Sequence, residues 1–250
     1  MTATLIRKLA HRQREKCFAL QHRYYDAQGW VHAYTVYERE VLGRLEQETA
    51  VLDIGCGRAF PFAAAMLKKS LRVFGVDPVA EASAAPAGAI VRQASGESLP
   101  YGDARFDLVI SRCVLEHIEH PPALFAEIAR VLRPGGEFVF LTPSRFDYVS
   151  VIASVVPNAL HPKIVHWTEG RAEADTFPTY YRANSHAAIR RLAGGAGLAV
   201  KELRYLHHCP TSLMFSPTLY RLATLYDKTV CSRERLAFLR GWILGALRQA

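Results

Sequence analysis

Short apolar runs recur at intervals through the middle of this chain. Such runs, rich in Val, Ile, Leu and Phe and bounded by glycine or polar residues, predict buried strands. The five runs lie at residues 51–54, 72–77, 89–91, 106–111 and 137–141. Between two of them, apolar residues at Leu124, Phe125, Ile128 and Leu132 have helical spacing and precede the stop Pro134-Gly135-Gly136. This alternation predicts an α/β fold built on a mostly parallel sheet.

The pattern also predicts elements outside this central region. Helices are expected over residues 2–20, 31–46, 61–67, 186–193 (before a Gly-Gly stop) and 217–230. A strand is expected at 198–206, and the segment 236–248 fits a helix or a strand, with a strand favoured at its tip. Residues 142–184 show no clear alternation, and so long an irregular segment is usually functional. We therefore predict a doubly wound sheet of about seven strands.

Composition indicates a real hydrophobic core and removes several classes of protein. Half of the 250 residues are hydrophobic and 22% are charged, which is typical of a single globular domain and not of a disordered chain. No apolar run approaches the roughly 20 residues of a membrane span, and no secretory signal peptide is recognisable. The five cysteines form no CxxC pair. We therefore expect no disulfide framework, no zinc or other metal site, and a cytoplasmic location.

Positive charge is concentrated at the start of the chain. The formal net charge is +8. The first 25 residues hold six lysines and arginines and only one acidic residue, Glu15. One interpretation is a solvated helix face, and the other is attraction to an anionic membrane surface or substrate. Nothing resembles a nucleic-acid-binding module, so no nucleic acid is expected as a partner. A peripheral membrane contact stays open.

The stretch from Asp53 to Gly57 connects the first predicted strand to a helix. Gly55-Cys56-Gly57 is a G-x-G turn, where glycines let the backbone approach a ligand. A dinucleotide-binding turn would carry a third glycine at position 60, which is Phe60 here. The acid before the turn favours a cationic ligand, because a carboxylate lowers the cost of holding positive charge.

Further polar residues follow the other predicted strands. Asp77 ends the second strand, about 20 residues after the glycine turn, where an acid can accept hydrogen bonds from ribose hydroxyls. The segments 95–97 and 112–117 follow the third and fourth strands. Ligands of open α/β sheets bind beyond the carboxyl ends of the strands, so all these segments should converge there.

At these motifs the sequence resembles the class I S-adenosylmethionine-dependent methyltransferases. The resembling stretches are VLDIGCG, VFGVD, SGESLPYGDARFDLVISRCVLEHI and VLRPGGEFVFLTPS, in order over about residues 50–144. Within the superfamily they are similar to the branch of small-molecule and quinone methyltransferases. The resemblance implies a Rossmann-like fold and S-adenosylmethionine as cofactor. The family often has glycine where Ala59 stands and aspartate where Ser95 stands.

The resemblance also implies cofactor contacts. The methionine end and the sugar of S-adenosylmethionine would lie against the first turn, and the ribose hydroxyls would bind the acid of the second strand. The adenine would lie along the 95–97 segment, and the methionine moiety would also lie beside the end of the fourth strand. The implied residues are Asp53, Gly55, Cys56, Gly57, Asp77, Ser95, Gly96, Glu97 and Cys113.

Methyl transfer requires alignment and exclusion of water, and a base only where the acceptor must lose a proton. His117, just beyond the fourth strand, is the first candidate for a base or a substrate contact; the alternative is a histidine that faces solvent or bonds the backbone. Further candidate substrate residues, which could instead pack a cap onto the sheet, are Tyr25, His166, Tyr180, Tyr181 and Arg182.

We therefore expect an enzyme that methylates a small-molecule or lipid-linked acceptor, at oxygen. The alternatives are a non-catalytic methyltransferase-like binding protein and an NAD-dependent oxidoreductase. The single domain is expected to comprise a helical cap (1–48), a cofactor-binding core (49–141), a substrate-cap insertion (142–185) and a C-terminal part of the sheet domain (186–250).

Overall fold

The computed structural model describes residues 3–155 and 177–250. Seven strands form one sheet in the order β3-β2-β1-β4-β5-β7-β6. The strands are β1 (Ala50–Ile54), β2 (Arg72–Asp77), β3 (Ile90–Gln93), β4 (Phe106–Arg112), β5 (Leu132–Pro143), β6 (Leu198–Leu206) and β7 (Trp242–Gln249). The first five run parallel, and β7 lies antiparallel between β5 and β6. The predicted mostly parallel sheet of about seven strands is confirmed, as is the strand favoured at the tip of segment 236–248.

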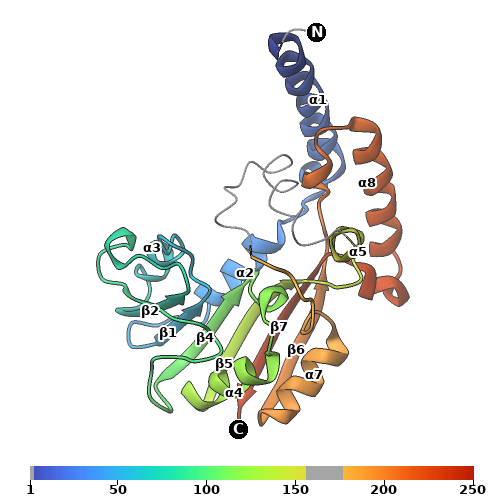
Figure 1. Ribbon diagram of the computed structural model, residues 1–250. Helices are drawn as coiled ribbons and strands as arrows, with labels where there is room; N and C mark the ends of the chain where they lie inside the picture. Colours follow the sequence, from blue (N-terminus) through green and yellow to red (C-terminus); the bar gives the residue numbers. More distant parts are fainter. Residues whose placement is uncertain (1–2, 156–176) are drawn as a thin grey trace.

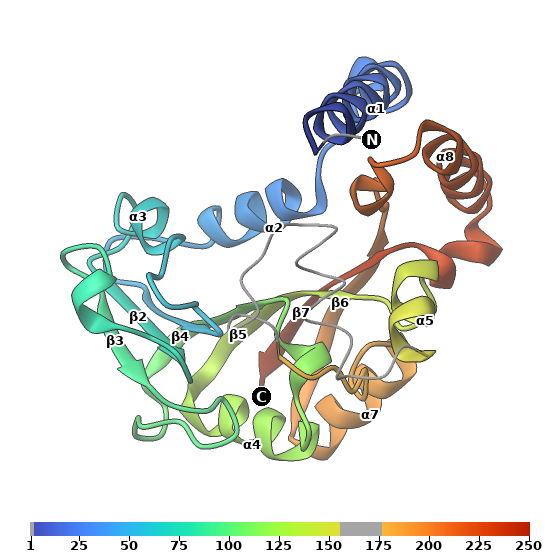
Figure 2. The ribbon, with the colours of Figure 1, turned by 45° about the horizontal axis from the view of Figure 1, so that its top comes forward.

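Helices cover both faces of the sheet (Figure 2). One face packs on α2 (Ala33–Leu42) and α3 (Ala63–Met66), and the other on α4 (Pro121–Val131) and α7 (His186–Gly195). Alternation along β5 makes both contacts possible: Phe138 and Phe140 point into the α4–α7 side, while Val139 and Leu141 point into the α2–α3 side. Both faces are buried, which explains why the central strands are nearly continuous apolar runs.

Two helices stand away from the sheet. The first helix, α1 (Ala3–Tyr24), lies beside α8 (Pro217–Cys231) at one end of the molecule (Figure 1). A small buried cluster joins them, made of Cys17, Leu20, Tyr25, Cys209, Met214 and Tyr220. Of the two helices expected before the first strand, α2 therefore covers the sheet and α1 pairs with α8. No described helix is long and apolar enough to cross a membrane.

The short elements include one helix that the sequence pattern did not predict. An α-helix, α5 (Tyr148–Val155), lies in the segment expected to be irregular. Its sequence YVSVIASV contains three valines and an isoleucine, β-branched residues that favour strands over helices, so local propensity did not indicate a helix. Five 3₁₀ turns complete the described fold: η1 (Asp26–Gln28), η2 (Ala82–Ala84), η3 (Leu115–His117), η6 (Thr211–Leu213) and η7 (Glu234–Leu239).

Several element boundaries also differ from the prediction, most clearly those of α2, α7 and β5. Helix α2 is shorter than the expected 31–46: it begins after His32, whose side chain caps it by accepting a hydrogen bond from Tyr34 N, and it ends at Leu42, before Gly43. Helix α7 continues through the glycine pair that was expected to stop it. Strand β5 begins at Leu132, because Leu132 already pairs with Phe106 of β4 before the glycine turn.

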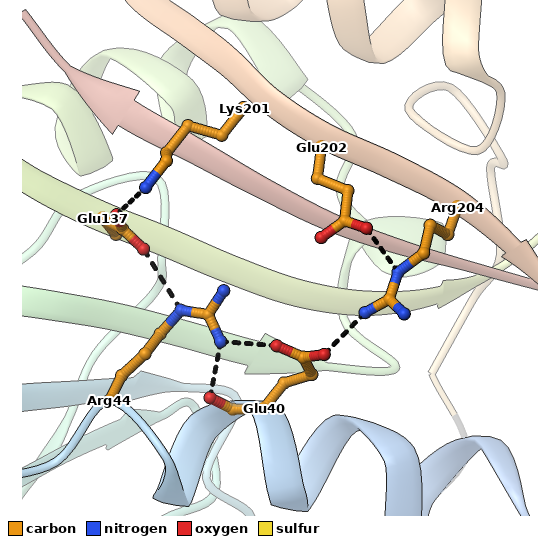
Figure 3. A network of polar contacts seen from close by, with 6 residues as sticks. All are labelled: Glu40, Arg44, Glu137, Lys201, Glu202 and Arg204. Carbon is orange, nitrogen blue, oxygen red and sulfur yellow. Dashed lines mark hydrogen bonds and ion pairs between the residues drawn. The ribbon is translucent and has the colours of Figure 1, made fainter.

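A chain of ion pairs attaches α2 to the far half of the sheet (Figure 3). Glu40 of α2 accepts hydrogen bonds from Arg44 at 2.7 Å and from Arg204 of β6 at 2.6 Å. Arg44 also donates to Glu137 of β5 at 3.1 Å, and Lys201 reaches the same carboxylate at 2.6 Å. The pairs lower the pKa of Glu40, mainly through Arg44. They fix α2 over β5 and β6, and with it the side chains that α2 contributes to the site.

Candidate active site

The carboxyl ends of β1, β2 and β4 border a cavity of about 400 Å³. Six of the predicted cofactor residues line it together: Gly55, Asp77, Ser95, Gly96, Glu97 and Cys113. The cavity lies where the sheet order reverses, between β1 and β4, which is the usual ligand position in doubly wound folds. The structure thus brings these residues together at the expected edge.

The glycine turn has the backbone that only glycine adopts easily. Gly55 and Gly57 have φ values of +77° and +74°. A Cβ at Gly55 would lie 2.1 Å from Val114 Cγ2, so any side chain there would displace the cavity wall. Gly57 N donates to Asp77 Oδ2 at 2.9 Å, which ties the turn to the end of β2.

The carboxylate of Asp77 is held in a fixed orientation at the cavity wall. Its two oxygens accept hydrogen bonds from Gly57 N and from Val79 N, each at 2.9 Å. A carboxylate offers about four acceptor positions, so two bonds leave room for a pair of hydroxyl donors. Its side chain lines the cavity and is largely buried. This geometry fits a ribose.

The segment 95–97 combines cavity lining with local structure. Glu97 N donates to Ser95 Oγ at 3.2 Å, and Glu97 Oε1 accepts from His120 N at 2.7 Å just before α4. Both side chains therefore have structural partners as well as a place in the wall.

A smaller cavity of about 210 Å³ shares Gly55 with the first. It contains one acid, Asp53, and one guanidinium, Arg112, beside Tyr37 and Cys56. Burial raises the pKa of Asp53 to about 8; Arg112 opposes the shift and Asp77 adds to it. Burial also raises the pKa of the Cys56 thiol. An acid and a guanidinium in one small cavity suit a zwitterionic amino acid end, such as that of S-adenosylmethionine.

Arg112 belongs to the segment 112–117 that was expected to converge at this edge, but neither Arg112 nor Tyr37 was among the predicted site residues. Arg112 is the last residue of β4, and its Nη1 donates to Glu38 Oε1 at 2.7 Å. Its position at a strand's carboxyl end was a usable signal. Tyr37 lies on α2, and nothing in the local sequence indicates that α2 reaches the turn after β1.

A third cavity, of about 620 Å³, adjoins the first across one contact. The hydroxyl of Tyr34, which lines the third cavity, lies 3.1 Å from Cys113 Sγ in the wall of the first. Tyr181 and Trp242 also line the third cavity and give it an aromatic surface. Cys113 itself has a left-handed backbone, with φ +58°.

Two buried titratable groups face this third cavity. Asp147 is 2% exposed, and burial raises its pKa to about 7. One of its oxygens accepts from Val149 N at 3.1 Å, and the other has no hydrogen-bond partner among the described residues. Burial, with His32 nearby, lowers the pKa of His208 to about 4. Neither residue lies in a motif that the sequence pattern indicates.

His117 lies in the wall of the first cavity and not of the third. Its Nδ1 is 2.8 Å from the Pro178 carbonyl oxygen, its Nε2 is 3.9 Å from a Glu116 oxygen, and its ring packs near Phe177. The contact with the Pro178 carbonyl fits the alternative of a histidine that bonds the backbone. The place of His117 in the cavity wall is compatible with the other alternative, a base or a substrate contact.

The candidate substrate residues are distributed over different surroundings. Tyr180 lines the first cavity and Tyr181 the third. Arg182 lies over the Tyr180 ring, 5.1 Å from its centre, and donates to the Glu119 carbonyl. Tyr25 lies in the α1–α8 cluster, beside a separate cavity of about 560 Å³. His166 is outside the described residues.

One group of potential metal ligands comes together within the described residues. Single atoms of His207, Asp227 and Cys231 lie within 4.8 Å of one another, and all three residues line the 560 Å³ cavity. The Cys231 thiol donates to Asp227 Oδ1 at 3.5 Å, and burial raises the pKa of Asp227 to about 6. The Asp227 carboxyl therefore already accepts a hydrogen bond from the thiol of this group.

Comparisons with known proteins agree with this geometry. Residues 52–140 match the family model of the methyltransferase domain. An uncharacterized methyltransferase of Mycobacterium sp. (strain JLS) is 42% identical over 90 residues, which are 34% of this chain and 35% of that protein. The match thus spans about a third of the relative's length.

Solved structures resemble the fold over most of the chain. An S-adenosylmethionine-dependent methyltransferase from Mesorhizobium loti has a TM-score of 0.51 at 20% identity, covering 85% of this chain and 98% of that one. The [4+2]-cyclase SpnF has a TM-score of 0.54 at 16% identity, covering 85% and 79%. The sheet order and its ligand edge define the class I methyltransferase fold. The match of residues 52–140 and the sheet order together identify a methyltransferase domain with the class I fold in this part of the chain.

Proposed function

We propose that this protein transfers a methyl group from S-adenosylmethionine to an oxygen atom of a small-molecule or lipid-linked acceptor. The contact between Tyr34 and Cys113 carries the proposal, because it joins the wall of a ribose-compatible cavity to the wall of a larger aromatic one. Two adjoining cavities are what a two-substrate transfer reaction needs.

The proposed cofactor contacts follow the two smaller cavities. Asp77 holds the ribose hydroxyls, Ser95 to Glu97 border the adenine, and Cys113 lies beside the methionine moiety. Asp53 receives the amino group and Arg112 the carboxylate. When bound, S-adenosylmethionine supplies an activated methyl group on a sulfonium sulfur. The chain's own contribution is to orient both ligands and to exclude water between the cavities.

The proposed acceptor site is the cavity of about 620 Å³. Tyr34, Tyr181 and Trp242 suit an aromatic or other flat acceptor. Asp147 is a buried carboxyl with a pKa of about 7, and one of its oxygens has no partner in the described part of the chain, which suits removal of a hydroxyl proton. His117 stays a proposed substrate contact from the cofactor side, with Tyr180 beside it.

The four-part division of the chain is also a proposal. Tyr34 comes from the 1–48 segment, and Asp147 and Tyr181 come from the 142–185 segment. All three line the same cavity, which supports the view that these two segments form the acceptor side while 49–141 holds the cofactor.

Calorimetry with S-adenosylmethionine and S-adenosylhomocysteine tests the cofactor half. We expect Asp77→Ala to lose most of the binding and Glu48→Ala, an exposed acid on the loop before β1, to keep it. Tritiated methyl transfer from the cofactor into fractionated extract tests the acceptor half and reports the acceptor class. Absence of binding by the wild-type protein would contradict the proposal.

The alternatives predict different results. A non-catalytic binding protein would bind the cofactor but transfer no labelled methyl group. The fold alone does not decide between these functions, since the similar structure SpnF is named a [4+2]-cyclase. An NAD-dependent oxidoreductase would bind NADH, which a fluorescence titration detects. Phe60 argues against it: the ring is fully buried and packs against Gly75 of β2, where a third glycine would leave space.

A further inference from the structure

A basic groove lies between α1 and α8, with a volume of about 480 Å³. Lys16 and Arg23 line it from α1 and Arg221 lines it from α8, and no acid is among its lining residues. All three side chains are exposed, and within the described residues none of them forms an ion pair. Uncompensated cations gathered in one groove attract anions.

Beside the groove, α8 exposes an apolar stripe. Leu219, Leu222 and Leu225 are 43%, 59% and 64% exposed and recur every three residues, so they share one side of the helix. The buried side of α8, which includes Tyr220 and Ala223, faces the rest of the protein. Arg221 lies between the two sides in the helical projection, so the leucine stripe borders the basic groove.

The stripe and the groove belong to the helix pair that stands away from the sheet (Figure 1). The groove shares no lining residue with the proposed acceptor cavity. Arg14 and Phe18, on another side of α1, do line the acceptor cavity. Helix α1 therefore separates the groove from that cavity and borders both.

We infer that the α1–α8 pair docks on an anionic phospholipid bilayer, with headgroup phosphates in the groove and the leucine stripe in the interface. Combined basic and apolar surface on a helix is the pattern that binds such interfaces. A soluble anion would satisfy the cations but leave the leucines in water. A second copy of the chain would bring Lys16, Arg23 and Arg221 near their own copies, which charge repulsion disfavours. The inference does not depend on methyl transfer.

Flotation of the full chain with vesicles tests this inference. We compare vesicles of phosphatidylcholine alone with vesicles that also contain phosphatidylglycerol. Binding is expected only with the anionic lipid and is expected to weaken as salt rises, because exposed charges are screened. Inorganic phosphate at the same ionic strength as the control salt should compete no better than that salt.

Two sets of variants separate the cations from the leucines. At about fivefold per cation near the surface, Lys16→Gln/Arg23→Gln/Arg221→Gln should lose about a hundredfold in affinity. The matched control Lys68→Gln/Lys69→Gln/Arg191→Gln removes the same charge from exposed positions elsewhere and should lose much less. Leu225→Ser should weaken binding several-fold, while Leu71→Ser, at an equally exposed leucine, should not.

Several outcomes would overturn the inference. Equal binding to neutral and anionic vesicles would do so, as would equal losses in the groove and control variants. Specific competition by inorganic phosphate would assign the groove to a soluble anion. Sedimentation that shows a dimer in the wild-type protein but a monomer in Leu225→Ser would assign the stripe to a second copy. Circular dichroism of each variant establishes that the fold is retained.

Discussion

The Tyr34 hydroxyl lies 3.1 Å from the Cys113 sulfur, and the guanidinium of Arg112 lies 4.7 Å from the centre of the same tyrosine ring. Tyr34 thus contacts Cys113 in the wall of the first cavity and Arg112 in the wall of the second, and it lines the third cavity itself. A single α2 side chain therefore forms the partition between the proposed cofactor and acceptor sites.

Removing the Tyr34 ring should connect the cavities to one another. We expect Tyr34→Ala to weaken S-adenosylhomocysteine binding about tenfold, since about 1–2 kcal/mol of wall contacts and cation–π packing disappear. Tyr34→Phe keeps the ring and should stay within about twofold of the wild type. Calorimetry measures both. Equal losses in the two variants would show that the hydroxyl, and not the ring, is what matters.

The raised pKa of Asp53 predicts a dependence of binding on pH. The free protein holds this carboxyl protonated below its pKa of about 8, and a bound ammonium or sulfonium favours the ionised form. Binding at pH 6.5 to 7 should therefore release a proton, seen as a dependence of the calorimetric heat on buffer ionisation enthalpy. Asp53→Asn should abolish that release at this site.

The same group has a consequence for stability. The pKa of Asp53 in the folded protein is above its ordinary value of 3.8. Its contribution to the free energy of unfolding is therefore fully present below pH 3.8 and is lost as the pH rises through about 8. Thermal unfolding at pH 6 and pH 9 should show a smaller decrease for Asp53→Asn than for the wild type. An unchanged decrease would mean that Asp53 is already ionised in the folded protein.

Arg112 is expected to recognise the carboxylate of the cofactor. A charge-assisted hydrogen bond contributes about 1.5–3 kcal/mol, so Arg112→Gln should bind S-adenosylhomocysteine about ten to a hundred times more weakly. Methylthioadenosine lacks the amino acid end, and its affinity should be nearly the same in both proteins. If both ligands weaken together, Arg112 acts through the shape of the cavity and not through the carboxylate.

The sequence predicted those parts of the site that single turns create. Asp53, Gly55 and Asp77 lie at or just after the carboxyl ends of predictable strands, and parallel strand ends must meet at one edge, so their meeting could be inferred. The partition between the two proposed sites could not be inferred in this way. Tyr34, Arg112 and Asp147 come from three separate elements, namely α2, β4 and the connection after β5. The pairing of α1 with α8 depends on contacts between the two ends of the chain, such as Leu20 with Tyr220 in one buried cluster, which no local pattern encodes.

Asp147 is expected to take the proton of a hydroxyl acceptor. The rate at saturating substrate should rise with pH through its pKa of about 7 and then level, because only the ionised carboxylate can accept a proton. Asp147→Asn should lose about 10²–10⁴-fold in rate and lose the inflection, with S-adenosylhomocysteine binding unchanged. A rate loss that leaves the inflection in place would assign the base to another group, with His117 tested next.

Glu40 should contribute to stability through its two arginine partners. Because pairing lowers its folded pKa, its contribution is present at neutral pH and is lost as pH falls through the acidic range. At 30% side-chain exposure, solvent screening limits the gain, and Glu40→Gln should cost about 1 kcal/mol at pH 7. Urea unfolding at pH 7 and at about pH 3 measures the difference, with Glu48→Gln, at an exposed acid that forms no ion pair within the described residues, as the control. Since Glu40 fixes the helix that carries Tyr34, the same variant should also weaken S-adenosylhomocysteine binding slightly, whereas a purely electrostatic surface pair would leave it untouched.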